Sequence, residues 1–220
     1  MATESFDTVS VENEPSKLLE QVALGKINYW STYVSDCSTA LVFLAYQLVY
    51  RHGSLLFTFL ATLIGYLAWG LTEYVFHRWV YHQKTWVFGE GHRFHHVDAQ
   101  ALIAMPWFMT TSVMIALWFI LAYKLNIPYF SCLQAGWLMG FVFYSLVHHS
   151  HHHWHFNFAW LRKRKAYHRI HHHFPETNYG VTVLFWDKVF GTRYEKEKTP
   201  PSGYANQGAS RQTENILQLH

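Results

Sequence analysis

Histidine is the residue type whose number and spacing stand out in this 220-residue chain. There are 17 histidines against 14 acidic residues, and ten of the histidines form four short clusters. The four clusters are His77 and His82; His92, His95 and His96; His148 and His152; and His168, His171 and His172. Imidazole is the commonest metal ligand among side chains. The set therefore predicts a metal centre, whereas two cysteines, Cys37 and Cys132, are too few for a cysteine-based zinc site or a disulfide framework.

The spacing within the clusters predicts two metal ions. Residues three or four apart lie on one helical face and can bind one ion together. The pairs at these spacings are His92 and His95, His148 and His152, and His168 and His171. His96 and His172 are each rotated by about 100° from the histidine before them, so each HxxHH motif can address two centres. Ten ligands over two octahedral ions leave about one open position on each, which oxygen chemistry requires.

The first pair has a different spacing. His77 and His82 are five residues apart and would lie about 140° apart around an ideal helix. We therefore expect either that the helix loosens at this point or that the pair straddles the two ions.

The remaining histidines are weaker candidates for metal ligands. His52 and His220 are expected to play no part in the site. The others could orient the ligands, carry protons or, less expectedly, bind metal directly; they are His149, His151, His153, His155 and His173. Glu73 and Asp187 are candidates to hydrogen-bond the outer nitrogens of ligand histidines, with helix capping or ion pairs to Arg78 and Lys188 as the alternative.

Long apolar runs must position these clusters. They cover Thr39 to Tyr50, Ser54 to Phe76, Pro106 to Tyr123, and Pro128 to Val147. The second run has 23 residues, enough at about 1.5 Å each to cross a hydrocarbon layer of about 30 Å. Charged residues make up only 14% of the chain, against about 25% in soluble domains. We expect about four transmembrane helices, the first being the shortest; buried helices of a soluble protein are the alternative.

The order of runs and clusters predicts where the histidines lie. Two crossings separate the second and third clusters, so all four clusters are expected on one side of the membrane. Of the 17 lysines and arginines, only Arg51 and Lys124 fall on the other side. The positive-inside rule then makes the histidine side cytoplasmic. The predicted fold is an all-α integral membrane protein with a cytoplasmic helical cap that carries a histidine-ligated di-metal site.

Composition divides the chain into three parts. Residues 1–35 form a polar tail with a possible interfacial helix that Gly25 ends, residues 36–192 form the membrane domain with its histidine cap, and residues 193–220 have the composition of a disordered tail. No cleaved secretory signal is expected. The net charge of +3 is too small to indicate a nucleic-acid partner.

Four sequence strings carry a family resemblance: EYVFHRWVYH at 73–82, GHRFHH at 91–96, HHSHHH at 148–153 and YHRIHHH at 167–173. Together they resemble the fatty acid hydroxylase superfamily (sterol desaturase/fatty acid hydroxylase), over about Leu55 to Thr192. The order and the HHVDAQALIAMP string at 95–106 are most similar to the fatty acid 2-hydroxylases. One departure is Tyr144-Ser145, where that subfamily tends to have an aspartate before the third cluster. The ending NYGVTVLFWDKVFGT at 178–192 is also similar to sterol-modifying members.

The resemblance implies a non-haem di-iron lipid monooxygenase in which the ten clustered histidines bind two iron ions and molecular oxygen is the co-substrate. Zinc could replace iron in overproduced protein. The expected reaction is 2-hydroxylation of a fatty acyl chain of the sphingolipid type. Alternatives are oxidation of a sterol or other isoprenoid lipid, acyl desaturation and, more remotely, metal transport, which the near absence of ionisable groups within the last two spans disfavours.

The expected partners are a membrane lipid and a separate electron donor, either a b-type cytochrome or a ferredoxin-like protein with its reductase. The expected location is the endoplasmic reticulum in a eukaryote or the cytoplasmic membrane in a bacterium.

Overall fold

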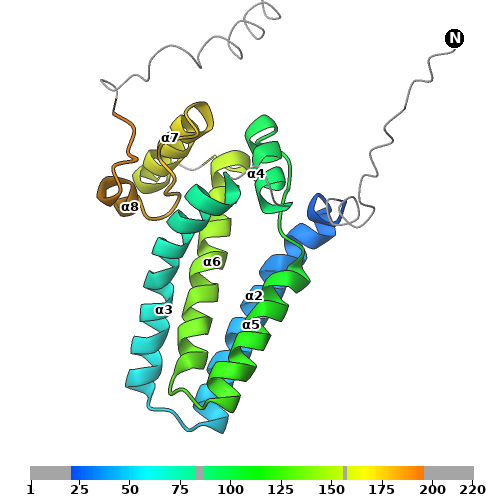
Figure 1. Cartoon of the computed structure of the whole chain (residues 1–220), viewed down its shortest axis with the longest axis vertical. Coiled ribbons are helices and arrows are strands. Elements are labelled where there is room, and N and C mark those ends of the chain that lie inside the picture. Colours follow the sequence, from blue (N-terminus) through cyan, green and yellow to red (C-terminus); the bar gives the residue numbers. More distant parts are fainter. Residues whose placement is uncertain (1–20, 83–86, 156–157, 196–220) are drawn as a thin grey trace, which may run out of the picture.

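The computed structural model describes residues 21–82, 87–155 and 158–195, and every regular element in these ranges is a helix (Figure 1). The α-helices and the π-helical segments that continue three of them are α2 (Lys26–Ala45) with η1 (Tyr46–Tyr50), α3 (Leu55–Phe76) with η2 (His77–Tyr81), α4 (Val87–Val97), α5 (Trp107–Leu117) with η3 (Trp118–Lys124), α6 (Phe130–His153), α7 (Ala159–His173) and α8 (Phe185–Val189).

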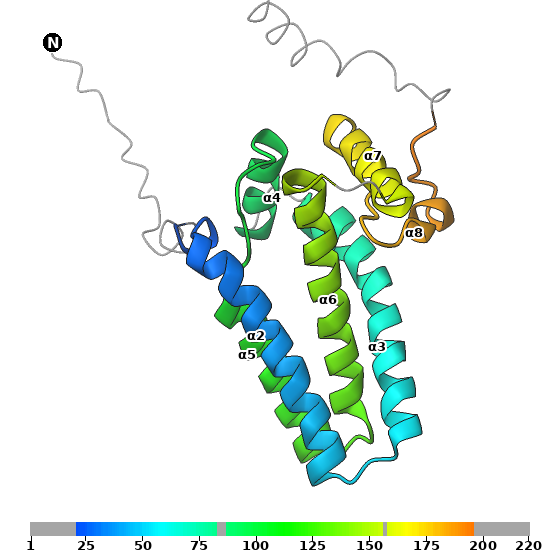
Figure 2. The same ribbon diagram turned by 180° about the vertical axis from the view of Figure 1, so that it is seen from behind.

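The long helices α2, α3, α5 and α6 form a bundle, and the short helices lie beyond one of its ends. α6 packs against α3 on one side and against α2 on the other, and α2 also packs against α5. Views from both sides show α4, α7 and α8 together at the same end (Figures 1 and 2). The bundle therefore serves as a base for the segments that contain the second and fourth histidine clusters.

Two glycines allow α3 and α6 to touch along their backbones. A Cβ atom on Gly65 would lie 2.0 Å from the Leu133 carbonyl oxygen, and one on Gly136 would lie 1.9 Å from the Thr62 carbonyl oxygen. Real Cβ atoms do not approach this closely, so each position requires glycine. This contact fixes α6, which carries the third cluster, relative to α3, which leads into the first.

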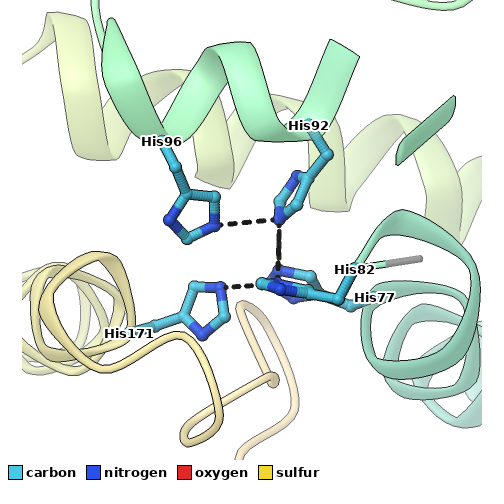
Figure 3. Close-up of side chains that lie close together, drawn as sticks. All are labelled: His77, His82, His92, His96 and His171. Atoms are coloured by element: carbon cyan, nitrogen blue, oxygen red, sulfur yellow. Dashed lines mark hydrogen bonds between the residues drawn. The ribbon is translucent and has the colours of Figure 1, made fainter. Parts of the chain in front are cut away.

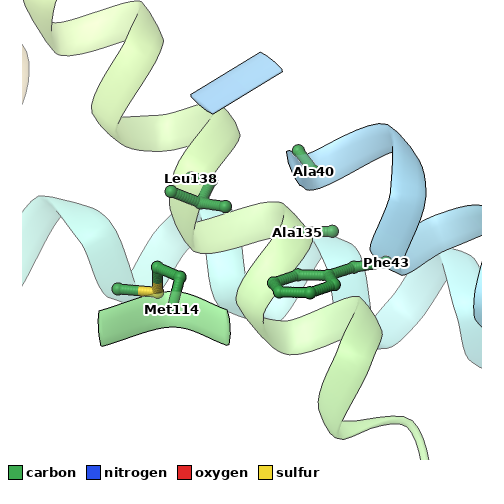
Figure 4. Packing of buried hydrophobic residues seen from close by; sticks show 5 residues of the cluster. All are labelled: Ala40, Phe43, Met114, Ala135 and Leu138. Atoms are coloured by element: carbon green, nitrogen blue, oxygen red, sulfur yellow. The ribbon is translucent and has the colours of Figure 1, made fainter. Parts of the chain in front are cut away.

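A small apolar core joins α2, α5 and α6. Its members are Ala40, Phe43, Met114, Ala135 and Leu138 (Figure 4). The Phe43 ring stacks on Trp118 with 5.8 Å between ring centroids. The amide of Gln134 donates to the Met114 carbonyl oxygen at 3.1 Å, which satisfies one polar group inside this contact.

Three helices in the described ranges are long and apolar enough to cross a membrane, namely Leu55–Tyr81, Trp107–Lys124 and Phe130–His153. Their outer faces are strongly apolar: Leu56, Ile64 and Leu67 are 61%, 59% and 64% exposed. Large apolar side chains exposed along such helices indicate insertion into lipid. The second, third and fourth predicted runs are confirmed as membrane-length helices, although the last continues past Val147 through the third cluster.

The first predicted run differs from the structure. Thr39 to Tyr50 is only the second half of a helix that begins at Lys26, so the predicted boundary after residue 35 falls inside α2. This helix is not among the three apolar spans because its first half contains buried polar residues such as Asn28, Thr32 and Asp36. Gly25 precedes α2 and follows a helical turn at 21–23. The rest of the predicted interfacial helix and most of both predicted tails lie outside the described residues.

Two turns close the bundle at the end opposite the histidines (Figure 1). The Arg51 guanidinium donates to the Asn126 side-chain oxygen, and the backbone N–H of Ser54 donates to the Tyr129 hydroxyl at 3.1 Å. Arg51 and Lys124 therefore lie at the far end of the bundle, as the order of the runs predicts.

Candidate metal centre

The helices bring nine of the ten clustered histidines into two compact groups. In each group, one ring nitrogen from every member lies within 4.8 Å of the others. The five-histidine group consists of His77, His82, His92, His96 and His171 (Figure 3). The four-histidine group consists of His95, His152, His168 and His172. His148 lies beside the second group, with its ring centroid 4.6 Å from that of His95 and 4.7 Å from that of His168.

The separations between Nε2 atoms fit a shared ion. In the five-histidine group, the His92 Nε2 atom lies 3.1 Å from those of His77 and His82 and 3.0 Å from that of His96. In the four-histidine group, His168 Nε2 lies 3.0 Å from His152 Nε2. Two nitrogens that bind one ion at right angles, each about 2.1 Å away, lie about 3.0 Å apart. The donor type and these separations both suit a transition metal.

A π-helical segment explains the spacing of the first pair. Residues 77–81 form η2, in which the helix hydrogen bonds join residues five apart. This places His77 and His82 in the same group, with ring centroids 5.3 Å apart. The predicted loosening of the helix is confirmed, and the alternative that the pair straddles two centres is wrong.

Each HxxHH motif contributes to both groups, as the spacing predicts, but the partners differ from those expected. His92 and His96 share the five-histidine group, and His168 and His172 share the other. The expected pairs three residues apart are divided between the groups instead. The reason is helix geometry. A side chain four residues along an α-helix points within about 40° of the first one, whereas a side chain three residues along points about 60° away from it.

Backbone carbonyl groups orient two members of the five-histidine group. His77 Nδ1 donates to the carbonyl oxygen of Tyr179, and His171 Nδ1 donates to that of Thr177 at 2.7 Å. A carbonyl can only accept, so the proton of each ring lies on Nδ1. The Nε2 lone pair of each ring is therefore free to face the other members of the group.

Glu73 and Asp187 act on the backbone rather than on a histidine. Glu73 Oε1 accepts the N–H groups of Val181 and Thr182 at 2.6 and 2.9 Å. Asp187 accepts those of residues 179 and 180, each at 2.8 Å. Among the described contacts neither carboxylate touches a clustered histidine or pairs with Arg78 or Lys188, so the predicted direct contact is wrong. Both instead shape the segment whose carbonyl oxygen orients His77.

Burial keeps the clustered histidines outside the spans neutral. Burial, followed by the neighbouring histidines, lowers the pKa of His95 and of His96 to about 2. Burial also lowers the pKa of His171 to about 3 and that of His172 to about 4. Only neutral imidazole has a lone pair for a metal. The Nε2 atom of His95 is buried without a hydrogen-bond partner, which further suits it to bind an ion.

The ambiguous histidines lie outside both groups. His149 is buried and its Nδ1 atom lies 2.8 Å from the Tyr29 hydroxyl oxygen. His151 is also buried, with its ring centroid 5.4 Å from that of His168. His153 stacks on His149 with 4.3 Å between centroids. The positions of the other histidines are as follows: His155 and His173 are exposed, His52 lies in the far turn, and His220 is outside the described residues.

A cavity of about 160 Å³ opens beside the histidines, between α2, α4, α6 and the segment at 99–106. His92, His95 and His148 line it, so it reaches members of both groups. Its remaining wall is largely apolar, but Thr32 and Asp36 of α2 add polar side chains that were not among the predicted site residues. The signal that could have revealed this buried face is the recurrence of polar residues every four positions, from Asn28, which binds backbone carbonyl groups beside the cavity, to Thr32 and Asp36.

A chain whose described elements are all helices, with membrane-length helices and two histidine groups able to hold metal, has the design of a membrane-embedded metalloprotein. Comparison with known proteins specifies the family. The family model for fatty acid hydroxylase matches residues 62–192, more than half of the chain. The chain belongs to the fatty acid hydroxylase family, which confirms the resemblance carried by the histidine motifs.

Characterised relatives include fatty acyl 2-hydroxylases. The chain is 31% identical over 138 residues to a dihydroceramide fatty acyl 2-hydroxylase of Arabidopsis thaliana, which covers 58% of each protein. It is 30% identical over 152 residues to a ceramide very long chain fatty acid hydroxylase of Schizosaccharomyces pombe, covering 59% of this chain and 41% of that protein. The chain thus matches about two fifths to three fifths of the length of these relatives.

A solved structure supports the same fold. The hydroxylase domain of scs7p superposes with a TM-score of 0.67 at 28% identity, covering 84% of this chain and 72% of that one.

Proposed function

We propose that this protein is a di-iron, oxygen-dependent membrane hydroxylase that adds a hydroxyl group at the 2-position of a lipid-linked fatty acyl chain. The main support for this proposal is that both histidine groups border one cavity with a largely apolar wall. The names of the relatives, which include a dihydroceramide fatty acyl 2-hydroxylase, support this substrate class.

The proposed ligands are the nine histidines of the two groups together with His148, whose ring contacts place it beside the four-histidine group. Hydroxylation of an unactivated C–H bond requires a redox-active metal, which zinc is not. Two iron ions would supply that chemistry, in which the C–H bond, molecular oxygen, two electrons and two protons yield the alcohol and water.

The chain's own residues provide the conditions for this reaction. The lowered pKa values of His95 and His96 keep both rings neutral at physiological pH. Apolar side chains such as Ile103, Met105 and Phe141 line the cavity and suit an acyl chain. Because these side chains offer water few partners, they favour a dry surrounding for the reacting carbon.

The proposed arrangement in the membrane has four spans, with α2 as the fourth. α2 runs beside α5 along the bundle, so it crosses together with α5 (Figures 1 and 2). Exposed basic residues such as Arg162, Lys163 and Arg169 lie on α7 at the histidine end. A cytoplasmic histidine face follows from the positive-inside rule. A separate electron-donor protein, a b-type cytochrome or a ferredoxin-like protein, would then dock on this face, in the endoplasmic reticulum or a bacterial cytoplasmic membrane.

Lipid analysis of cells that produce matched variants tests the proposal. The double variant His96→Ala with His168→Ala removes one ligand from each group, whereas His173→Ala removes an exposed histidine from the same helix as His168. We expect 2-hydroxylated acyl lipids with the wild type and with His173→Ala, and none above background with the double variant.

Metal analysis of the purified proteins accompanies the lipid measurement. We expect two metal ions per wild-type chain. Normal folding of the wild type without new hydroxylated lipid would refute the proposed reaction, and one ion per chain would refute the two-ion centre.

A further inference from the structure

Asp36 is a buried carboxylate on the wall of the cavity that reaches the histidines. The residue is 1% exposed, and neither of its carboxylate oxygens has a hydrogen-bond partner among the described residues. It lines the cavity together with Tyr29, Thr32 and Tyr33, which precede it on α2, and with Tyr144 of α6. A buried carboxylate without a partner is strongly unfavourable unless something else donates to it.

The nearby hydroxyl groups of α2 are engaged elsewhere. Thr32 Oγ1 donates to the Asn28 carbonyl oxygen at 3.0 Å. The Tyr29 hydroxyl lies 3.2 Å from that of Tyr33 and 2.8 Å from His149 Nδ1. Asp36 therefore brings two buried acceptor oxygens to the wall of the cavity, and no donor among the described residues is directed at them.

We propose that Asp36 accepts a hydrogen bond from an O–H or N–H group in the polar part of the lipid substrate. This inference rests on the proposed function and adds to it a residue that holds the polar part of the lipid. At neutral pH a free fatty acid offers a carboxylate in place of such a donor, and an acyl thioester has no donor at its linkage. Asp36 is thus a specificity-determining residue and takes no part in the oxidation itself.

The position of Asp36 suits this role. It lies seven residues beyond Tyr29, which corresponds to about 10 Å along α2. Tyr29 contacts His149, the residue that follows His148 on α6. A polar group held by Asp36 therefore lies a short distance along the cavity from the histidines, which leaves the nearby acyl carbons free to reach them.

Equilibrium binding of a short-chain dihydroceramide to metal-loaded protein in detergent tests the inference. We expect Asp36→Leu, which removes both acceptor oxygens at a similar side-chain size, to weaken binding by about two- to tenfold, the contribution typical of one hydrogen bond. Thr39→Val is the matched control, because Thr39 is buried on the same helix but does not line the cavity. Asp36→Leu should unfold at a temperature no lower than the wild type, since it replaces a buried, unpartnered polar side chain with an apolar one.

Methylated lipids show which donor Asp36 holds. The O-methylated or the N-methylated dihydroceramide, whichever lacks the bonded donor, should bind the wild type as weakly as the parent lipid binds Asp36→Leu. Methylation should cause no further loss in that variant. Equal binding of all three lipids to the wild type would overturn the inference even if the variant failed to fold. Unchanged binding of the parent lipid to Asp36→Leu would overturn it as well.

Turnover separates this inference from the proposed function. Asp36-dependent binding without any hydroxylated product would refute the proposed reaction alone. Product formation with Asp36-independent binding would refute only the role of Asp36.

Discussion

Glu73 offers a direct test of how the five-histidine group is held together. The side chain is 2% exposed and accepts three hydrogen bonds, from the backbone N–H groups of Val181 and Thr182 and from the Thr182 hydroxyl. Glu73→Ala leaves these three donors without an acceptor. Each unsatisfied buried donor costs about 1–3 kcal/mol, so we expect a loss of at least about 3 kcal/mol in the stability of this region.

The effect should extend to the metal. The segment that Glu73 holds follows Tyr179 in the chain. The carbonyl oxygen of Tyr179 accepts the hydrogen bond from His77 Nδ1. Loss of a group that orients a ligand typically lowers metal affinity by about 10- to 100-fold. Glu73→Gln keeps one acceptor oxygen and loses mainly the charge, so its effect should lie between those of the wild type and Glu73→Ala.

Metal release to an excess of chelator, followed over time together with thermal unfolding in detergent, is the appropriate assay. We expect one of the two ions to leave about 10- to 100-fold faster from Glu73→Ala than from the wild type, and the release of the other to change little. Glu90→Gln alters an exposed carboxylate that pairs with Arg93 on α4 and serves as the control. Unchanged release of both ions, or equal acceleration of both, would show that Glu73 does not orient one group through residues 179–182.

Two further predictions concern packing and pH. Gly136→Ala should destabilise the protein by at least about 1–3 kcal/mol in thermal or denaturant unfolding, because its Cβ would lie 1.9 Å from the Thr62 carbonyl oxygen. Gly91→Ala, whose Cβ would have its nearest neighbour at 3.5 Å, is the control. Equal stability of the two variants would contradict the close approach of α3 and α6. The pKa values of His95 and His96 are about 2 in the folded chain and about 6.5 in an unfolded one. Below about pH 6.5 the unfolded chain therefore binds more protons than the folded chain. The metal-free protein should lose stability as the pH falls from about 7 to 4. An unfolding temperature that stays constant over this range would refute the neutral, buried state of these rings.

Much of the arrangement could be predicted from local patterns. Apolar length identifies three of the helices, and the even number of crossings between clusters predicts that all the histidines meet at one end. The five-residue interval between His77 and His82 predicts the departure from α-helical geometry, which the structure realises as a π-helical segment. These features depend on neighbouring residues of one helix, for which sequence spacing is a sufficient guide.

Other features depend on contacts between distant segments. Glu73 binds backbone N–H groups 108 and 109 residues away, and a backbone donor has no residue type to reveal it. The length of α2 was underestimated for a different reason. Apolar content identifies only its second half, whereas Asn28, Thr32 and Asp36 in its first half face the bundle and the cavity rather than lipid. Polar residues on an inward face conceal a helix from any criterion based on mean hydropathy.

The contacts that the sequence could not reveal also make the two groups unequal. In the five-histidine group, His77 and His171 each donate Nδ1–H to a carbonyl oxygen in the segment at 177–182, and Glu73 and Asp187 hold that segment through its backbone. In the four-histidine group, His168 Nδ1 has no hydrogen-bond partner among the described residues. Rings held in a fixed orientation lose less freedom when they bind an ion. The slower of the two release phases in the wild type should therefore belong to the five-histidine group, and it is this phase that Glu73→Ala accelerates toward the faster one.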